Sequence, residues 1–441
     1  MTPDKSQLPT LKQLSSLLEL YKEGRYLEAI DYGKQLQVVS PSEANITHIL
    51  GAVQAALGNY DRAIIYFART IELNAYFVFA YNNLGNAQNE LGKFDDAVKS
   101  CQKAIKLDPC LTEAYNNMGI ALNHLEKREG AIRSYKTALR IKADYVEAYN
   151  NLGNTLHEVE KYEDAINSYS KAIQLTPNLL EAYHNLAGVS LHFGEEKKAL
   201  RFFVRTLCID PEHAPARHMI SALQGKTTET APRDYIIGLF DRYAASFDEN
   251  LTKNLSYKTP ELLRQLYNDH VRTAIMHSNA IDLGCGTGLS GAAFSSVCEQ
   301  LTGIDLSRRM IDKAQKKSIY DHLVVGDILE TLEEYSKRET TFDLFICADV
   351  MVYIGDCEGL FRSIKEVSTD GALFIFSTEY DEGNYFSLNK GGRYSHSDQY
   401  IKSCAQKFNY KLIACQKCFL RSEKERYLDG SLFILENRKN T

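Results

Sequence analysis

The segment AIDLGCGTGLSG, residues 280–291, combines an apolar run, an acid and a cluster of glycines. The apolar run predicts a buried strand, and Gly284, Gly286 and Gly288 predict a tight turn at which a ligand can approach the backbone. Asp282 precedes the turn, where its charge would repel a pyrophosphate and attract a cationic amine. The turn therefore favours a ligand that carries an amine and no phosphate.

Acids also end the two strands expected next along the chain. Asp305 lies 21 residues after Gly284, where a carboxylate can accept hydrogen bonds from both hydroxyls of a ribose. Asp327 follows at the next strand end and could accept from an adenine amino group, with Ile328 and Met310 packing on the ring. One such acid is more often a turn residue or a helix cap, but three at successive strand ends indicate a nucleoside site.

Short apolar strands alternate with helical segments around these motifs. We expect strands at residues 280–283, 301–305, 322–325, 343–348, 372–378, 411–415 and 431–435. Strand–helix alternation of this kind predicts a parallel, doubly wound sheet.

The combination resembles the class I S-adenosylmethionine-dependent methyltransferases over about residues 235–441. FDLFICADVMVYIGD, GALFIFSTE and FDRYAASFDENL also match that family, whereas dinucleotide-binding turns carry glycine where Leu289 stands. The resemblance implies a Rossmann-like domain with a seven-stranded, mostly parallel sheet and S-adenosylmethionine as cofactor. The implied cofactor-binding residues are Tyr243, Asp282, Gly284, Cys285, Gly286, Gly288, Asp305, Leu306, Met310, Asp327, Ile328 and Ala348.

The resemblance further implies an aromatic cap over the donor. Tyr243 and Phe247 would belong to it, because an aromatic face can meet a sulfonium cation. The alternative for both residues is ordinary helix packing.

Residues that could act on the acceptor follow the fourth strand and lie in KGGRYSHSD, residues 390–398. Methyl transfer from a sulfonium mainly requires alignment of the acceptor, and a base only where the acceptor must lose a proton. Arg393 could pair with an acceptor carboxylate and His396 could relay a proton, although serines capping a helix near Asp398 explain the same stretch. The catalytic candidates are Asp349 and His396, and the substrate-binding candidates are Tyr353, Arg393 and Tyr394.

A period of 34 residues runs through the first half of the chain. Alanines recur at this step at Ala29, Ala63, Ala97, Ala131, Ala165 and Ala199. Each unit reads as two amphipathic helices, and the pattern resembles the tetratricopeptide repeat in six units over about residues 10–213. We therefore expect an α-solenoid at residues 1–220, a linker at 221–234 (SALQGKTTETAPRD) and the methyltransferase domain at 235–441.

Asparagines keep the same period at Asn83, Asn117, Asn151 and Asn185. A row of side-chain amides along a solenoid groove could hydrogen-bond an extended peptide backbone, which makes these the candidate partner-binding residues. The row resembles the asparagine ladder in the repeats of O-linked N-acetylglucosamine transferase. The alternative is that each amide bonds to the neighbouring helix.

Composition excludes several classes. The net charge of −6 and the lack of a basic block argue against nucleic acid and membrane surfaces as partners, and no apolar run is long enough to span a membrane. Ten scattered cysteines and no secretion signal favour a cytoplasmic protein. The pair Cys415 and Cys418 lacks a second ligand pair, so no metal site is expected.

These observations favour a methyltransferase whose repeats bring or position the acceptor, with a protein or peptide as the expected partner and acceptor. Two alternatives stay open. A small carboxylic acid could be the acceptor while the repeats serve assembly, or the chain could be a non-catalytic scaffold that keeps a donor-binding module.

Overall fold

The computed structural model describes residues 10–243, 247–249, 251, 257–271, 275–423 and 426–438. Contacts divide the chain into two compact units, Met1–Val189 and Ser190–Thr441. The second unit therefore includes helices from the end of the repeat pattern together with the α/β elements. The predicted domain boundaries at residues 220 and 235 stay a prediction. The contacts divide the chain at a different position, between Val189 and Ser190.

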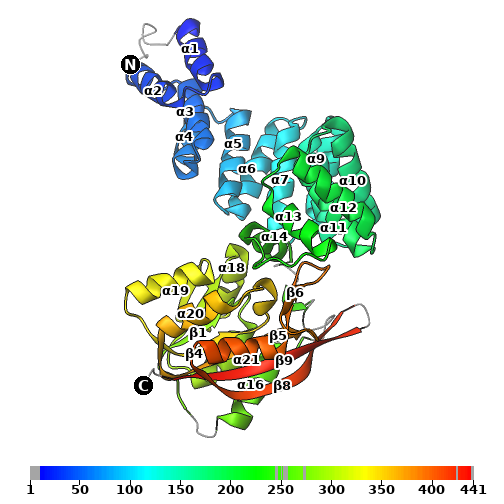
Figure 1. Ribbon diagram of the computed structural model, residues 1–441. Coiled ribbons are helices and arrows are strands. Elements are labelled where there is room, and N and C mark those ends of the chain that lie inside the picture. Colours follow the sequence, from blue (N-terminus) through cyan, green and yellow to red (C-terminus); the bar gives the residue numbers. More distant parts are fainter. Residues whose placement is uncertain are drawn as a thin grey trace. The chain divides into compact units, whose positions relative to one another are not determined.

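Paired helices form the repeat region, as the 34-residue period predicts (Figure 1). In order they are α1 (Leu11–Lys22), α2 (Tyr26–Val39), α3 (Ala44–Ala56), α4 (Tyr60–Leu73), α5 (Val78–Glu90), α6 (Phe94–Leu107), α7 (Thr112–His124), α8 (Arg128–Ile141), α9 (Val146–Glu158), α10 (Tyr162–Leu175), α11 (Leu180–His192), α12 (Glu196–Ile209) and α13 (Ala214–Leu223). Glycine lets paired helices approach closely: a Cβ added at Gly119 would lie 2.5 Å from Tyr135 Cε1. The α-solenoid prediction is confirmed.

The α/β elements of the second unit form one sheet. Its strands are β1 (Ala280–Leu283), β2 (Leu301–Asp305), β3 (His322–Val325), β4 (Phe342–Cys347), β5 (Ser368–Tyr380), β6 (Phe386–Leu388), β7 (Tyr394–His396), β8 (Tyr410–Glu423) and β9 (Arg426–Asn437). The order β3-β2-β1-β4-β5 is parallel throughout, β9 runs antiparallel to β5, and β8 pairs with β9. All seven expected strands are present, so the mostly parallel sheet is confirmed. The β6–β7 hairpin, which pairs with the end of β5, was not expected.

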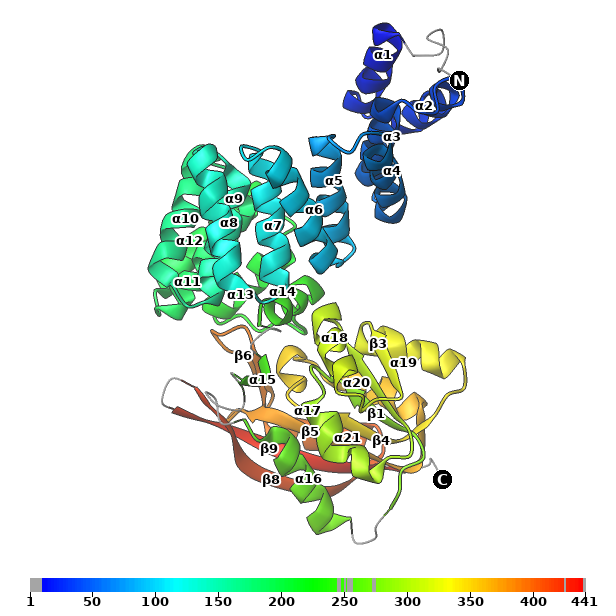
Figure 2. The same ribbon diagram turned by 180° about the vertical axis from the view of Figure 1, so that it is seen from behind.

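Helices cover both faces of this sheet. They are α14 (Arg233–Tyr243), α15 (Phe247–Glu249), α16 (Thr259–His270), α17 (Leu289–Phe294), α18 (Arg308–Lys316), α19 (Ile328–Lys337), α20 (Glu358–Glu366) and α21 (Asp398–Lys407). One buried cluster joins α19, α20 and α21 to the sheet, and a second joins α16 and α17 to its other face (Figures 1 and 2). Continuous apolar strands such as FDLFIC form because both faces are buried.

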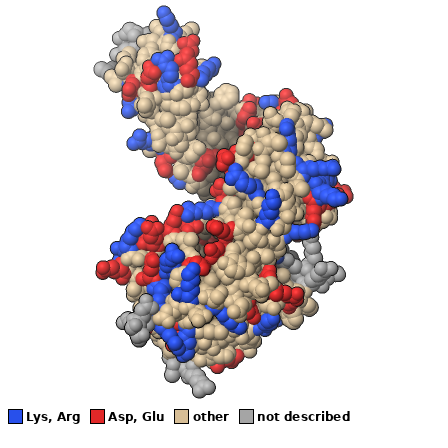
Figure 3. All heavy atoms as spheres, in the orientation of Figure 1, with Lys and Arg blue, Asp and Glu red and all other residues tan. Residues whose placement is uncertain are grey.

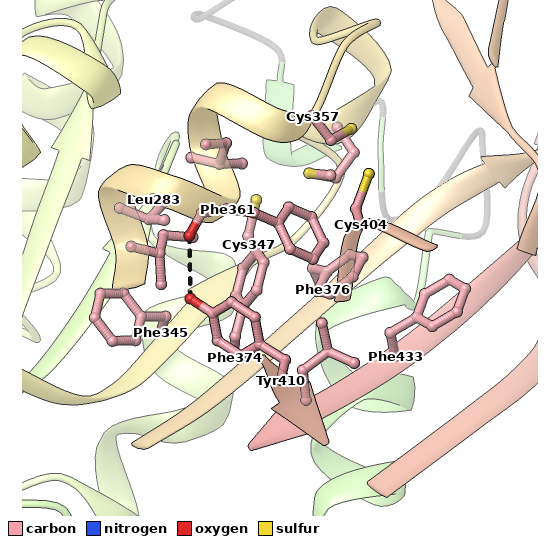
Figure 4. Packing of buried hydrophobic residues seen from close by; sticks show 14 of the residues in the cluster. Leu283, Phe345, Cys347, Cys357, Phe361, Phe374, Phe376, Cys404, Tyr410 and Phe433 are labelled. Atoms are coloured by element: carbon pink, nitrogen blue, oxygen red, sulfur yellow. Dashed lines mark hydrogen bonds between the residues drawn. The ribbon is translucent and has the colours of Figure 1, made fainter. Parts of the chain in front are cut away.

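Aromatic packing fills the first of these clusters (Figure 4). Phe361 of α20 meets Phe374 and Phe376 of β5 edge to face, with ring centroids 5.6 and 5.9 Å apart. The buried hydroxyl of Tyr410 donates to the Phe361 carbonyl oxygen at 3.2 Å. This rigid layer supports the carboxyl ends of β4 and β5, where the candidate acceptor residues lie.

Lys and Arg are interspersed with Asp and Glu over the face shown in Figure 3. Within the described part of the chain, no helix combines the length and apolarity that crossing a membrane requires.

Candidate active site

The glycine turn after β1 is shaped by packing at its two ends. Gly284 has φ +70°, and a Cβ there would lie 2.3 Å from Val350 Cγ2. Gly288 has φ +93°, and its Cβ would lie 3.1 Å from Tyr320 Cε2. Because both positions combine left-handed backbone with close neighbours, glycine is required at each for the turn itself.

The central glycine differs from its neighbours. Gly286 also has a positive φ of +52°, but among the described residues the only atom that its Cβ would approach within 4 Å is Phe247 Cε1, at 3.8 Å. The turn is therefore open beside Gly286, underneath the aromatic ring of Phe247. A flat ligand could lie against the backbone there, and a side chain at residue 286 would fill the same space.

Asp305 stands beside this opening at the carboxyl end of β2. Its Oδ2 accepts from the Gly286 amide at 2.9 Å and its Oδ1 from the Ser307 amide at 2.8 Å. Burial raises the pKa of Asp305 to about 6, and the nearby charge of Asp241 adds to the rise. Each carboxylate oxygen has a second lone pair, so two further hydroxyls could donate to this group.

Asp282 lies beneath the turn in β1 and is fully buried. The hydroxyls of Ser290 and Tyr320 both donate to its Oδ2 at 2.6 Å, and burial raises its pKa to about 6. Its Oδ1 is buried, and none of the described residues donates to it. An orphaned buried carboxylate oxygen next to an open turn fits a ligand that brings its own donor, such as an amine.

Two acidic side chains anchor α14 and α15 over the turn. Asp241 accepts from Ser307 Oγ at 2.6 Å, and its carbonyl oxygen accepts from Arg309 Nη1 at 2.8 Å. Asp248 pairs with Lys317 Nζ at 2.7 Å and also accepts from the Thr287 hydroxyl. The segment predicted as a cap thus contacts the turn, through pairs that the sequence analysis missed.

Of the two aromatic residues predicted for this cap, the structure describes the side chain of Phe247 only. Phe247 lies over Gly286 and meets Phe240 with ring centroids 5.8 Å apart. Phe240 in turn packs edge to face on Tyr353 at 5.4 Å. The side chain of Tyr243 lies outside the described residues.

Asp327 begins α19 as a helix cap. Its Oδ1 accepts from the amides of Leu329 at 2.9 Å and Glu330 at 3.2 Å, and its Oδ2 pairs with Arg233 Nε at 3.2 Å. The capping alternative is therefore the observed role, and the adenine contact stays a prediction.

The remaining predicted donor residues surround the turn as packing groups. Cys285 and Met310 are buried, and the Met310 amide donates to Ser307 Oγ at 3.1 Å. Ile328 and Ala348 pack against the two core clusters, and Leu306 is half-buried between Asp305 and Ser307. None of these side chains carries chemistry of its own.

Four charged side chains form a buried network at the carboxyl ends of β4 and β5. Arg421 Nη1 donates to Asp349 Oδ2 at 2.5 Å, and its Nη2 donates to Glu379 Oε1 at 2.6 Å. Arg393 Nε lies 2.9 Å from the same Glu379 oxygen. The side chains of Arg421 and Glu379 are 7% and 3% exposed, whereas Arg393 is 25% exposed. Two acids and two arginines balance in charge, and Arg393 is the member most open to an acceptor.

Asp349 occupies a constrained position in this network. Its φ is +56°, which is uncommon for a residue other than glycine. The Asp349 amide donates to Ser377 Oγ at 2.9 Å, and the Ser377 hydroxyl donates back to Asp349 Oδ1 at 3.2 Å. Backbone strain held by side-chain bonds is frequent at functional sites.

Two residues of the GGRYSHS stretch differ from their predicted roles. His396 is fully buried, and its Nε2 lies 2.9 and 3.0 Å from the carbonyl oxygens of Ile354 and Gly355. Burial lowers the pKa of His396 to about 4, so the ring is a neutral structural donor, and the predicted proton relay needs a correction. Tyr394 is also fully buried, with its hydroxyl 2.5 Å from Thr228 Oγ1, so it packs rather than facing an acceptor.

The asparagine rows of the first unit bond to one another. Asn117 Nδ2 donates to Asn82 Oδ1 at 3.0 Å and Asn151 Nδ2 to Asn116 Oδ1 at 3.1 Å, each reaching into the preceding repeat. Asn185 Nδ2 likewise donates to Asn154 Oδ1 at 2.8 Å, and Asn83 Nδ2 lies 3.1 Å from His48 Nε2. The alternative of bonds between neighbouring helices is thus observed, and the contact with a bound peptide stays a prediction.

Comparison with known families adds to this geometry. Residues 276–429 match the family described as a methyltransferase domain. Residues 17–76, 78–109, 121–160 and 153–189 match tetratricopeptide repeat families. The chain joins tetratricopeptide repeats to a methyltransferase domain.

Relatives of the methyltransferase domain are distant. The ubiquinone biosynthesis O-methyltransferase of Actinobacillus pleuropneumoniae serotype 7 (strain AP76) is 27% identical over 148 residues, which cover 32% of this chain and 62% of that protein. The protein of the same name from Shewanella halifaxensis (strain HAW-EB4) is 23% identical over 145 residues, covering 32% and 61%. The chain thus spans about three fifths of the length of these relatives.

Among solved structures, the crystal structure of MamA is similar to this chain at 25% identity and a TM-score of 0.34, covering 37% of this chain and 96% of that one. A methyltransferase domain of this class takes its methyl group from S-adenosylmethionine. The open turn at Gly286, the orphaned oxygen of Asp282 and the carboxylate of Asp305 fit that cofactor.

Proposed function

We propose that the protein transfers a methyl group from S-adenosylmethionine to an acceptor that the repeats bring or position. The observation that carries the proposal is the turn at Gly286, which is open on one side and flanked by the buried carboxylate of Asp282 and the half-buried carboxylate of Asp305. A strand–turn–helix unit with this donor and acceptor set suits an amino-acid-bearing nucleoside better than a phosphate-bearing one.

Each donor-site residue has a role in this proposal. Asp305 accepts from the ribose hydroxyls, Asp282 Oδ1 receives the amine, and Asp327 lies at the adenine end with Met310 and Ile328. Phe247 covers the turn and keeps water away from it. When bound, S-adenosylmethionine supplies an activated methyl group, so this chain needs only to align the acceptor atom with that methyl group and to exclude water.

The acceptor lies, in this proposal, beside the charged network at the ends of β4 and β5. Arg393 and Tyr353 contact it, because Arg393 is the exposed end of the network and the Tyr353 ring packs on Phe240. Asp349 is held by Arg421 and Ser377, which suits a fixed acceptor of a proton or a hydrogen bond. A protein or peptide acceptor is supported by the tetratricopeptide repeats, which commonly bind extended chains.

A small-molecule hydroxyl is the second candidate acceptor. It is supported by the relatives, which are named as O-methyltransferases of ubiquinone biosynthesis. In that case the repeats serve assembly rather than delivery of the acceptor.

A labelling experiment tests the proposal. The full chain is incubated with S-adenosylmethionine labelled in the methyl group and a dialysed cell extract, and label is followed into protein and into small molecules. Gly286→Val should abolish transfer, because its side chain fills the open space in the turn. Gly371→Val is the matched control, since Gly371 also has a positive φ and no atom near its Cβ but lies at the start of β5. Transfer that persists in Gly286→Val, or no label in either fraction with the unchanged chain, would contradict the proposal.

Donor affinity is expected to fall at acid pH. Burial raises the pKa of Asp305 in the folded chain to about 6, whereas the carboxyl group in the unfolded chain titrates near pH 4. Between these two values the folded chain binds the proton and the unfolded chain does not, so the folding stability declines as the pH rises through this range. Ribose hydroxyls donate to the ionised carboxylate, so S-adenosylhomocysteine should bind about tenfold more weakly at pH 5 than at pH 7. Calorimetry at both pH values measures this. Asp305→Asn should shrink the difference, and equal affinity in the unchanged chain would exclude a titrating donor site.

A further inference from the structure

The Gly391–Gly392 turn of the β6–β7 hairpin is held by a helix that belongs to the repeat pattern. His218 of α13 is 3% exposed, and its Nε2 lies 3.0 Å from the carbonyl oxygen of Gly392. Since a carbonyl oxygen only accepts, His218 Nε2 must carry the proton. The hydroxyl of Tyr235, in α14, donates to the neighbouring Gly391 carbonyl oxygen at 3.3 Å.

The fit between this turn and the helices is close. Gly392 has φ +79°, and a Cβ there would lie 2.5 Å from the Tyr235 hydroxyl oxygen and 2.7 Å from Met219 Sδ. The His218 ring also lies against Tyr235, with ring centroids 4.8 Å apart. Gly392 of the GGRYSHS stretch therefore allows close contact with both α13 and α14.

The same turn fixes the residues of the charged network. Asn389 Oδ1 accepts from the amides of Gly391 at 2.9 Å and Arg393 at 3.2 Å. Asn389 Nδ2 donates to Glu379 Oε2 at 3.3 Å, and Arg393 Nε lies 2.9 Å from Glu379 Oε1. A displacement of the turn would therefore move two groups that contact Glu379 together, the Arg393 guanidinium and the Asn389 side-chain amide.

Residues 226–232, here called the strap, run from α13 to α14 and reinforce this arrangement. The amide of Leu388, in β6, donates to Thr227 Oγ1 at 3.2 Å. The Glu229 carbonyl oxygen accepts from the amide of Gly355 at 2.8 Å, and the Ala231 amide donates to the Tyr353 carbonyl oxygen at 3.0 Å. The strap thus ties the hairpin and the segment that carries Tyr353 to the end of the repeat pattern.

We propose that His218 is a positioning residue for the acceptor side: it holds the Gly391–Gly392 turn and thereby sets Arg393 against Glu379. The role of Arg393 at the acceptor rests on the proposed function, whereas the hold on the turn rests on the contacts alone. In this arrangement α13, the last helix of the repeat pattern, also positions a residue of the acceptor site.

Three variants of the full chain test this positioning role. His218→Phe keeps a ring but leaves the Gly392 carbonyl oxygen without its donor. His218→Gln keeps an N–H group in a similar place and should restore the unchanged behaviour. His277→Phe is the matched control, because His277 is also 3% exposed and bonds to the Tyr267 hydroxyl at 3.1 Å, at the opposite edge of the sheet.

The first readout is hydrogen–deuterium exchange in peptides that cover residues 386–396. Exchange there should be about tenfold faster in His218→Phe, which is the effect of losing one hydrogen bond, and unchanged in His218→Gln and His277→Phe. Unchanged exchange in His218→Phe, or a failure of His218→Gln to restore it, overturns the proposal.

The second readout separates positioning from support of the fold. With cell extract as the acceptor source, the half-saturating amount of extract should rise about tenfold in His218→Phe, while the rate at saturation and the affinity for S-adenosylhomocysteine stay within twofold. Faster exchange without a rise in half-saturation would show that His218 only supports the fold and would overturn the role. If the unchanged chain transfers no label, the proposed function fails, and the exchange measurement still decides whether His218 holds the turn.

Discussion

Asp305→Ala is expected to weaken binding of S-adenosylhomocysteine by at least a hundredfold. The carboxylate lies half-buried beside Gly286 and would accept from both ribose hydroxyls, each a charge-assisted hydrogen bond worth about 1.5–3 kcal/mol. Together these bonds correspond to about 10²–10⁴ in affinity. Isothermal titration calorimetry with the folded variant measures the change.

Asp321→Ala provides the matched control for this measurement. Asp321 also accepts a backbone hydrogen bond, from the Leu301 amide at 2.8 Å, but it does so at the amino end of β2. Loss of a carboxylate there should leave donor affinity within about twofold. Unchanged affinity in Asp305→Ala, or an equal loss in both variants, would remove Asp305 from the donor site.

Arg421→Met should lower the stability of the second unit by about 3–5 kcal/mol. The change leaves the buried carboxylate of Glu379 and the half-buried carboxylate of Asp349 without the guanidinium that both of them contact. For a unit of this size the melting temperature should fall by about 6–20 °C. Thermal melts measure the shift, and the transition of this unit is the one that S-adenosylhomocysteine raises.

Lys411→Met is the control on the same strand. Lys411 Nζ pairs with Glu436 at 3.2 Å between β8 and β9, but both side chains are well exposed, so the loss should stay within about 1 kcal/mol. Adding Asp349→Asn and Glu379→Gln to Arg421→Met should restore much of the stability, because Arg393, the charge of the network that then remains, is 25% exposed. A melting temperature that stays unchanged in Arg421→Met would show that the network does not carry the stability assigned to it.

Local signals predicted the strands of the sheet well. The apolar runs of β1, β2 and β4 are bounded by glycine or acid, and such runs show strand ends without knowledge of the tertiary fold. Asp282 and Asp305 follow from their places at strand ends. Asp327 could not be resolved in the same way, because a helix cap and a ligand acceptor require the same residue type at the same position.

Signals from distant segments could not be read from the sequence. Arg421 lies within a strand pattern, 72 residues after Asp349 and 42 after Glu379, so nothing local indicates the network. His396 lies four residues after Gly392 and was expected to relay a proton, but it belongs to β7 and is fully buried. A buried histidine and a reactive one look alike until their neighbours are known.

The asparagine rows show a related ambiguity. Their period correctly indicates that the amides line up from repeat to repeat, but an amide can bond to its neighbour in the row as well as to a bound peptide. Periodicity indicates which residues share a face of the solenoid. It does not indicate whether their side chains hydrogen-bond to one another or to a bound partner.

The strap has a consequence for recombining this protein with other recognition modules. Its threonine-rich sequence, KTTETAP, suggests a permissive splice point, yet its backbone is hydrogen-bonded to the segment around Tyr353 and Gly355. A chimera joined at Gly225 would replace His218 and Met219 while keeping the hairpin that rests on them. A junction in the turn before α11 would instead keep α12, α13 and the strap together with the α/β elements of the second unit.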